Sequence, residues 1–562
     1  METQKNSETN QILAAIVYLA DRCDGAHADD NAGFNAYDAE NGHRMAALIR
    51  EGRSLSMIDF QRALSFTRKY KNQLNCEFYL EWDEESDQYE AFKRTDFAIS
   101  TSPNREGLND QQSAAFDGIT EWYRNRYASR QALIEGFAGT GKTYSCAKVT
   151  KELIEVDRAK ICMTAFTHKA CQVLDKFAKE AGLNVEVRTI CNLLGLTVSA
   201  PDKKGRCKIE QKSDDKSHQY DFVWVDEGSM VGHGLNGFVE DMQARYVVMG
   251  DPCQLPDVET GLDSPVFSTI KTKWELTKVV RYDGSILRRV TDIRENITQK
   301  KVPFAKYEKG VFDKFNSDYW LENLIERYKK AALSDEQDPN SIRALAWSNA
   351  RVQAVNYAVR TAIYGDHALP YIAGERLVAK DIIEIQHPDG DWRSGAMWKT
   401  GSNTVLMYSC DECVIQSVKR GSKMVFGASF EGWFLDVLTD QGDEATIFMP
   451  DEKEKSRIIE VCGAKKKAIL DMHFEDRKRP QAWAIFYKGL NELGLKMAGD
   501  GFMRKLQYAF CMTVHQSQGS TFKTVFVDVS NICGCQDTYM RNRLWYTADS
   551  RASQELYELN NF

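Results

Sequence analysis

The segment from 132 to 154 constrains the fold of this chain more than any other. ALI, residues 132–134, is a short apolar run typical of a buried strand, and GFAGTGKT, residues 136–143, follows closely. The helical spacing of residues 144–154 completes a strand–loop–helix unit that fits the phosphate-binding pattern G-x-x-x-x-G-K-[ST]. Glycines let the backbone wrap phosphates, and N–H groups at the helix start face negative charge. The segment therefore predicts an α/β domain that binds a nucleoside triphosphate.

The loop supplies a first set of candidate ligands for ATP. The Lys142 ammonium is expected to reach the β and γ phosphates, and the Thr143 hydroxyl is expected to hold Mg²⁺. The ATP-binding candidates in the loop are Gly136, Gly139, Thr140, Gly141, Lys142 and Thr143. An ordinary glycine-rich turn is the alternative, but the flanking strand and helix argue against it.

Two later strand-like runs end in polar residues that ATP hydrolysis requires. FVWV, residues 222–225, is followed by Asp226 and Glu227. Because ligands of open parallel sheets lie at the carboxyl ends of strands, Asp226 is expected to hold Mg²⁺ through water, and Glu227 to orient and deprotonate the attacking water. YVVMGDPCQLP, residues 246–256, is a third strand that runs into a polar turn, where Gln254 is a candidate γ-phosphate sensor. A surface Asp-Glu pair and a plain turn are the alternatives.

Length and composition limit the class of protein. With 562 residues, the chain has room for roughly three to five domains. Its net charge of −8 argues against a purely electrostatic nucleic-acid binder, although a local groove can still be positive. The N-terminus lacks the pattern of a signal peptide, and no apolar run reaches the length of a membrane span. No association with a membrane is therefore expected.

The 14 cysteines are scattered in non-repeating spacings, which favours free thiols in a reducing compartment such as the cytoplasm. One CxxC pattern, Cys410–Cys413, and one CxC pattern, Cys533–Cys535, lie far apart and lack nearby histidines. Because a structural zinc ion usually takes four ligands from two such pairs, free thiols are favoured over a zinc site.

The candidate residues belong to an ordered series that resembles the motifs of superfamily 1 helicases, and within them the RecD/Dda-like subclass. The matching segments are 108–115 (LNDQQSAA), 136–143, 164–170 (TAFTHKA), 189–194 (TICNLL), 226–230 (DEGSM), 250–256, 276–281 (LTKVVR), 346–349 (AWSN) with Asn356, 513–520 (TVHQSQGS) and 546–552 (YTADSRA). Gln516, Asp257 and Asp549 depart from the family pattern, but none of the three removes a group that the chemistry needs.

The resemblance implies further roles for individual residues. Gln112 would read the adenine, and Arg281 and Arg551 would reach the γ-phosphate from a second domain. The catalytic set is then Lys142, Asp226, Glu227, Gln254, Arg281 and Arg551, with ATP and Mg²⁺ as cofactors. Nucleic-acid contacts are implied for Thr164, Phe166, His168, Lys169, Thr189, Thr513, His515 and Ser517. Without the resemblance, His168 and His515 are equally typical of ordinary loop histidines.

The fold that the resemblance implies is α/β, with two RecA-like P-loop motor domains. The first would span residues 106–280, and the second would combine residues 281–370 with 501–562. Within the first, residues 197–221 contain two β-capable runs around the turn Asp202–Gly205, which predicts a β-hairpin pin. A solvated loop is the alternative for that segment.

Two further parts are predicted outside the motor. Residues 371–500 contain the strand-like runs SNTVLMYS, ECVIQSVKR, KMVFGASF, GWFLDVLT and EATIFMP, followed by a lysine-rich helical stretch. These runs are similar to the SH3-like β-barrel insertion of Dda-type helicases, with a helical extension. Residues 1–105 predict a mainly helical accessory domain, with one helix capped by Ser56.

The resemblance implies an ATP-dependent DNA helicase that translocates 5′→3′ on single-stranded DNA and separates duplex strands. Expected partners are single-stranded DNA, duplex junctions and, through residues 1–105, replication or recombination proteins. A monomer in the cytoplasm of a bacterium or of a phage-infected cell is expected. An RNA helicase of the same superfamily and a nucleic-acid-binding protein with a decayed motor remain the alternatives.

Overall fold

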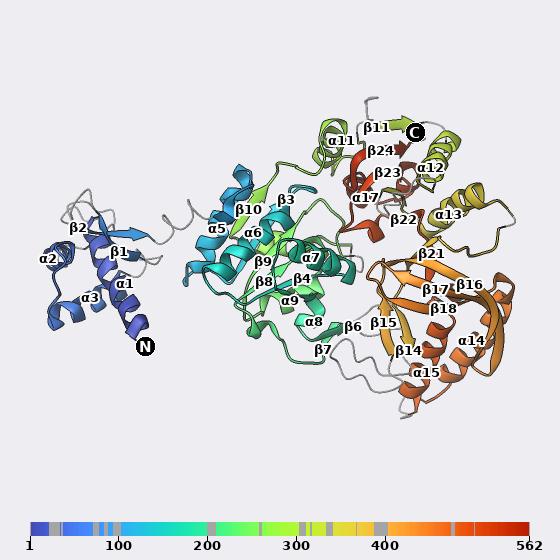
Figure 1. Ribbon diagram of the computed structural model, residues 1–562, viewed down its shortest axis with the longest axis horizontal. Helices are drawn as coiled ribbons and strands as arrows, with labels where there is room; N and C mark the ends of the chain where they lie inside the picture. The colour runs from blue at the N-terminus through green and yellow to red at the C-terminus, as the bar shows by residue number, and fades with distance from the viewer. Residues whose placement is uncertain are drawn as a thin grey trace.

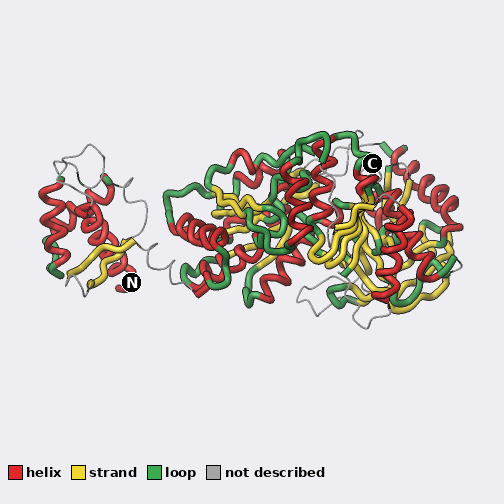
Figure 2. The backbone as a smooth tube through the Cα atoms, turned by 90° about the horizontal axis from the view of Figure 1, so that it is seen from above, coloured by secondary structure: helices red, strands yellow, loops and turns green. Residues whose placement is uncertain are grey.

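The structure, a computed structural model, contains two parallel β-sheets flanked by helices, an antiparallel insertion and a small N-terminal module (Figure 1). The N-terminal module lies apart from the other parts, at one end of the molecule, in both views (Figure 1, Figure 2). The residues that the structure describes are 2–21, 34, 38–70, 78–83, 88–93, 103–198, 209–257, 261–302, 311–314, 317–332, 341–366, 368–386, 403–473, 478–499 and 501–560.

The N-terminal module combines three helices with a β-hairpin. Its elements are α1 (Glu2–Asp21), α2 (Ala39–Arg50), α3 (Met57–Lys69) and the antiparallel strands β1 (Phe78–Asp83) and β2 (Gln88–Lys93). Helix α3 begins as predicted, because the Ser56 side chain accepts a hydrogen bond from the Asp59 N–H at 3.2 Å. Helix α1 and the hairpin are additions that the sequence pattern does not predict.

The first motor domain is built on a six-stranded parallel sheet with the strand order β10-β3-β9-β8-β4-β5. Its strands are β3 (Gln131–Gly136), β4 (Ile161–Ala165), β5 (Glu186–Thr189), β8 (Phe222–Val225), β9 (Arg245–Gly250) and β10 (Lys273–Leu276). Its helices are α5 (Asp110–Arg124), α6 (Lys142–Glu155), α7 (His168–Glu180), α8 (Ile190–Leu193), α9 (His233–Glu240) and α10 (Val266–Thr269). Because β3, β9 and β8 are neighbours, the polar residues after these three strands meet at one edge of the sheet.

The strand predictions for this sheet are confirmed at β3, β8 and β9. All four residues of β8 are buried, as expected for a parallel strand covered by helices on both faces. The indole N–H of Trp224, a buried residue of β8, donates to the Thr150 hydroxyl of α6 at 2.8 Å. This contact ties the helix after the phosphate loop to the strand that precedes Asp226.

The second motor domain contains a five-stranded parallel sheet with the order β11-β24-β23-β12-β22. Its strands are β11 (Val311–Lys314), β12 (Ile342–Ala346), β22 (Cys511–Thr513), β23 (Phe522–Asp528) and β24 (Ala552–Leu559). Its helices are α11 (Gly284–Glu295), α12 (Ser317–Ala332), α13 (Asn349–Tyr364), α16 (Val529–Ile532) and α17 (Thr538–Asp549). Strands from before and after the insertion pair in this sheet, so two chain segments form one RecA-like domain.

The insertion contains a five-stranded antiparallel sheet with the order β18-β17-β16-β13-β21. Its strands are β13 (Arg376–Ala379), β16 (Glu412–Val425), β17 (Ala428–Thr439), β18 (Glu444–Pro450) and β21 (Leu506–Tyr508). Two hairpins, β14 (Ile383–Gln386) with β15 (Asn403–Met407) and β19 (Leu495–Ala498) with β20 (Gly501–Arg504), and two helices, α14 (Lys455–Leu470) and α15 (Arg479–Glu492), complete it.

Two predictions for the insertion are wrong. KMVFGASF is not a separate strand, because it crosses a two-residue turn at Phe426 and Gly427, whose φ angles of 55° and 79° suit a tight hairpin between β16 and β17. The boundary at residue 500 is also wrong, because β21 pairs with β13 and the insertion extends to Tyr508. A three-residue strand gives too short a pattern to reveal its partner from sequence.

The segment predicted to form a hairpin contains two short strands. Strand β6 (Leu196–Val198) pairs antiparallel with β7 (Ile209–Gln211). The predicted turn Asp202–Gly205 between them lies outside the described residues.

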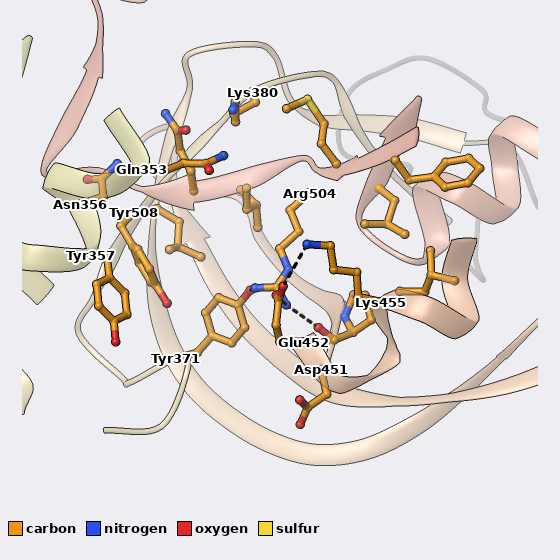
Figure 3. A pocket seen from close by; sticks show the side chains of 18 of the residues that line it. Gln353, Asn356, Tyr357, Tyr371, Lys380, Asp451, Glu452, Lys455, Arg504 and Tyr508 are labelled. Atoms are coloured by element: carbon orange, nitrogen blue, oxygen red, sulfur yellow. Dashed lines mark hydrogen bonds and ion pairs between the residues drawn. The ribbon is translucent and has the colours of Figure 1, made fainter. Parts of the chain in front are cut away.

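A cleft of about 430 Å³ separates α13 of the second motor domain from the insertion (Figure 3). Tyr357, Tyr371 and Tyr508 gather on one side of it (Figure 3). On the other side, Glu452 pairs with Arg504 at 3.0 Å and with Lys455 at 3.9 Å. The cleft therefore combines a paired ionic group with an apolar lining that includes Leu377, Ile458 and Phe502.

Two general features concern the whole described chain. No helix among the described residues combines the length and the apolar character that crossing a bilayer requires. The cysteines within the described ranges, including Cys410, Cys413, Cys533 and Cys535, are free thiols.

Gly432 allows β17 to approach β18 closely. A Cβ at this position would lie 2.4 Å from the Met449 carbonyl oxygen, and that backbone atom has no rotamer by which to move away. Gly432→Ala is therefore expected to lower the free energy of unfolding by about 1–3 kcal/mol. The control is Gly463→Ala in α14, where no atom lies within 4 Å and a gain of up to about 1 kcal/mol is expected. Thermal unfolding of both variants measures the difference, and equal midpoints would contradict the close approach.

Candidate functional site

The phosphate loop connects β3 to α6 with two left-handed glycines. Gly139 and Gly141 have φ angles of 81° and 79°, which side-chain-bearing residues rarely adopt. A Cβ at Gly139 would lie 2.8 Å from the Cβ of Arg281, and one at Gly141 would lie 2.6 Å from the Gln112 amide nitrogen. The loop therefore keeps a bare backbone surface, which is the shape that a phosphate chain needs.

Lys142 lies at the start of α6 and folds back along the loop. Its Nζ donates to the carbonyl oxygens of Gly136 at 2.7 Å and Phe137 at 3.0 Å. Burial lowers the pKa of Lys142, while the charges of Asp251, Asp226 and Glu227 oppose this shift. Because its hydrogen bonds go to neutral carbonyl groups, the ammonium retains a strong attraction for anionic phosphate oxygens.

The carboxylates after β8 occupy the adjacent strand end. The Asp226 N–H donates to the Thr164 carbonyl oxygen, and an Asp226 carboxylate oxygen accepts from the Glu227 N–H at 2.8 Å. Burial, and then the charge of Glu227, raise the pKa of Asp226 to about 7. Glu227 itself has a left-handed backbone with φ 55°, a conformation that concentrates at functional sites.

The residues fit a magnesium ion shared with phosphates. Burial and the charge of Glu227 disfavour the ionised Asp226 carboxylate, and a cation beside it would favour that form. The Thr143 hydroxyl is half-buried in the first turn of α6, after the loop. Among the described residues, no group of three or more His, Cys, Asp or Glu side chains forms a closed metal cage. One carboxylate and one hydroxyl suit Mg²⁺, which usually keeps waters and phosphate oxygens as its other ligands.

The two arginines reach this site from the second motor domain. The Arg281 N–H donates to the Gly139 carbonyl oxygen at 3.1 Å, and its guanidinium donates to the Ser550 carbonyl oxygen at 3.3 Å. Burial and the charge of Arg551 lower the pKa of Arg281 to about 10. Arg551 is 2% exposed, and its Nη2 donates to the Gln254 side-chain oxygen at 3.0 Å. All six predicted catalytic residues are thus brought together at one domain junction.

Sequence reasoning missed a hydrogen-bonded network beside the loop. The Arg294 guanidinium and the Tyr546 hydroxyl donate to the two Asp251 carboxylate oxygens at 2.5 and 2.7 Å. The Ala138 N–H donates to the Tyr546 hydroxyl at 3.1 Å, and Arg294 lies 3.7 Å from the Phe137 ring centroid. The network joins both motor domains to the loop. Asp251 and Tyr546 lie within the motif-like segments, whereas no sequence signal identifies Arg294.

Gln112 lies directly against the phosphate loop. Its side-chain oxygen accepts from the Asn109 N–H at 3.0 Å in a capping box, and its amide nitrogen donates to the Thr140 carbonyl oxygen at 3.0 Å. The residue is 4% exposed. In this arrangement Gln112 supports the phosphate loop, and its amide keeps a second N–H and a second acceptor lone pair for a further partner.

Four of the predicted nucleic-acid contacts are buried. Their hydroxyls are engaged within the fold, so the structure does not support direct side-chain contacts to a strand. Thr164 donates to the Trp224 carbonyl oxygen, Thr189 caps α8, Thr513 bonds to Gln516, and Ser517 donates to the Val514 carbonyl oxygen. Motif spacing does not predict the burial of these four hydroxyls, because a side chain next to a surface residue can point into the protein.

The other four lie nearer the surface. Phe166 is half-buried and packs against the cluster that contains Ile190. His168, Lys169 and His515 line one cavity of about 310 Å³ between the two motor domains and the insertion. Burial lowers the pKa of His515, which favours its neutral ring. The structure therefore brings three of the eight predicted contacts to a common space.

The raised pKa of Asp226 predicts a pH effect on stability. In the protein free of nucleotide and metal, the stabilisation from protonated Asp226 is fully present below about pH 4 and is lost as the pH rises through about 7. The amide of Asp226→Asn does not ionise, so this variant should gain stability over the wild type as the pH rises. Thermal unfolding at intervals from about pH 5 to about pH 8, on both sides of the Asp226 pKa, measures the effect. Parallel pH profiles for the two proteins would exclude it.

Comparisons with known proteins agree with this geometry. The AAA domain family model matches residues 107–311, and the UvrD-like helicase C-terminal domain model matches residues 508–557. An uncharacterised protein of Acanthamoeba polyphaga mimivirus is 23% identical over 509 residues, covering 80% of this chain and 99% of that protein. The ATP-dependent DNA helicase Dda of Enterobacteria phage T4 is 25% identical over 285 residues, covering 47% of this chain and 62% of Dda.

Solved structures show weaker likeness. A crystal structure of the Pif1 helicase from Bacteroides in complex with ADP-AlF3 and ssDNA is 15% identical, with a TM-score of 0.41, covering 81% of this chain and 93% of that chain. The regions that the two family models match contain Lys142, Asp226, Glu227, Gln254, Arg281 and Arg551. Together with the similarity to Dda, these matches support a superfamily 1 helicase of the Dda-like group.

Proposed function

We propose that this helicase uses ATP hydrolysis to translocate 5′→3′ along single-stranded DNA and to separate the strands of a duplex. The observation that carries the proposal is the position of Arg281 and Arg551, which belong to the second motor domain and meet the phosphate loop and Gln254 of the first. DNA as substrate rests on the similarity to Dda, an ATP-dependent DNA helicase, and the 5′→3′ direction rests on the resemblance of the motifs to those of the RecD/Dda-like subclass.

Each group of the site has a distinct role in hydrolysis. Lys142 and the loop N–H groups bind the phosphates, and Glu227 orients and deprotonates the attacking water. Arg281 and Arg551 stabilise negative charge that develops on the γ-phosphate, because guanidinium groups are permanently charged and match phosphate oxygens. Thr143 and Asp226 would hold Mg²⁺, which would supply positive charge to stabilise the phosphates.

Hydrolysis produces movement through the domain junction. While both arginines contact a γ-phosphate, the two motor domains are drawn together, and loss of that phosphate removes the attraction. His168 and Lys169 belong to the first motor domain and His515 to the second, so a strand in their shared cavity contacts both. A change in the junction therefore shifts one set of contacts along the strand relative to the other.

The remaining parts have supporting roles in this proposal. The β6–β7 hairpin acts as the pin that splits the duplex, and the insertion acts as an SH3-like barrel that braces it. The N-terminal module offers a surface for replication or recombination proteins. The free thiols of the described cysteines fit a reducing compartment such as the cytoplasm.

Unwinding of duplexes with one single-stranded tail tests activity and polarity together. The wild type should separate a duplex with a 5′ DNA tail and leave one with a 3′ tail intact. Lys142→Ala should be inactive on both, because it removes the ammonium that binds the phosphates. Unwinding by Lys142→Ala would contradict the assignment of the site, and a preference for RNA tails would reassign the substrate.

Arg551→Ala should separate nucleotide binding from hydrolysis. We expect this variant to bind ATP and to lower kcat by about 10³-fold, as for other arginines that contact a transferred phosphoryl group. Single-turnover hydrolysis and fluorescent-nucleotide binding measure the two effects. Arg541→Ala, in the helix α17 that ends just before Arg551, is the control, because the Arg541 guanidinium donates to the Lys300 carbonyl oxygen away from the site. Full hydrolysis by Arg551→Ala would remove this residue from the active site.

A further inference from the structure

The insertion forms one side of the cavity between the motor domains, and no sequence motif predicts this contribution. Besides Lys169 and His515, its lining includes Tyr408, Ser409 and Cys410 of the insertion. With a volume of about 310 Å³, it lies at the small end of ligand pockets. It has room for a flat ring and the atoms attached to it, but not for a duplex.

The Tyr408 ring lies face to face with the His168 ring. Their centroids are 3.5 Å apart and their planes differ by 12°. His168 is nevertheless exposed to solvent, and Tyr408 is half-buried. Because Tyr408 covers one side of the His168 ring and the cavity borders both residues, the stack leaves aromatic surface open to a further ring.

The tight turn from Tyr408 to Asp411 holds this ring in place. Cys410 has a φ of 73°, a left-handed conformation that is uncommon for residues other than glycine. An Asp411 carboxylate oxygen accepts from the Tyr408 N–H at 2.8 Å and from the Gln172 amide of α7 at 3.1 Å. The CxxC pattern thus belongs to a strained turn that fixes Tyr408 against the first motor domain.

Two residues with a strained backbone line this cavity, one from the first motor domain and one from the insertion. Glu227 and Cys410 are two of the four described non-glycine residues with positive φ, and both line this cavity. Strained backbone concentrates where surrounding structure holds a functional geometry. The cavity therefore joins the residue that activates water to the residues that face a strand.

We propose that Tyr408 is a nucleic-acid-binding residue, and that a base of the translocated single strand stacks on the His168–Tyr408 pair within this cavity. The inference rests on the proposed function and adds the insertion to the surfaces that hold the strand. Base–aromatic stacking suits a motor, because every base has a π-face and the contact ignores sequence. Lys169 and the N-terminus of the 13-residue helix α7 supply positive charge for the adjoining phosphates.

The test compares Tyr408→Ala with Tyr408→Phe in the full chain. Fluorescence anisotropy with a short labelled dT oligonucleotide, at fixed salt, measures Kd. Tyr408→Ala should raise Kd about tenfold, whereas Tyr408→Phe should bind like the wild type because it keeps the ring. Tyr487→Ala is the matched control, since Tyr487 is an exposed tyrosine of α15 that stacks on Trp483 instead. It should leave Kd unchanged.

Several outcomes would overturn the inference. An unchanged Kd for Tyr408→Ala, or an equal loss in Tyr408→Phe, would show that the ring face does not contact the strand. If thermal unfolding shows that Tyr408→Ala does not fold, Tyr408→Leu replaces it, because leucine keeps apolar volume and removes the aromatic face. Tyr408→Leu should then raise Kd about tenfold. A wild type that neither binds the oligonucleotide nor increases its ATPase rate with it would contradict the proposed function itself. Wild-type binding with an unaffected Tyr408→Ala would remove only this inference.

Discussion

The fold depends on bringing charged groups of both signs out of water at one junction between two sheets. The groups concerned are Lys142, Asp226, Asp251, Arg281 and Arg551. Burial lowers the pKa of the lysine and of both arginines, and it raises the pKa of Asp226. Burial thus weakens the charged form on both sides, although Arg281, with a pKa of about 10, keeps its charge at neutral pH, so the charges present only partly compensate one another. A phosphate chain with a divalent cation would relieve both deficits at once, because it adds negative charge beside the cations and positive charge beside Asp226.

Asp251 is the exception, and it divides the site into two parts. Although burial favours its neutral form, Arg294 and Lys142 hold the pKa of Asp251 below its usual value. Its two oxygens accept from Arg294 and Tyr546, and Tyr546 in turn accepts from Ala138 of the loop. This satisfied carboxylate gives the junction a fixed contact between motor domains. The groups around Lys142 remain available for a ligand. The junction thus combines a fixed contact at Asp251 with a second part that a bound ligand can change.

The sequence predicts the parts of this arrangement that local patterns encode. The phosphate loop, the buried strand before Asp226 and the cap at Ser56 follow from residue types at short spacing, and the structure contains all three. The wrong predictions concern side-chain direction and long-range pairing. Thr164 points into the sheet, and β21 finds its partner β13 about 130 residues away. Arg294 and Tyr408 gain their roles only through tertiary contacts, so no local pattern identifies them.

The contacts of the insertion have a consequence for the proposed movement. The chain ties the insertion to the second motor domain, yet Tyr408 and Asp411 contact His168 and Gln172 of the first. If the two motor domains separate after hydrolysis, these contacts must shift or break, because they cross the same junction. A base on the His168–Tyr408 pair would then lose part of its stack when Arg281 and Arg551 lose the γ-phosphate. Strand binding and nucleotide binding would thus be coupled directly, because the contacts between the insertion and the first motor domain cross the same junction as the nucleotide site.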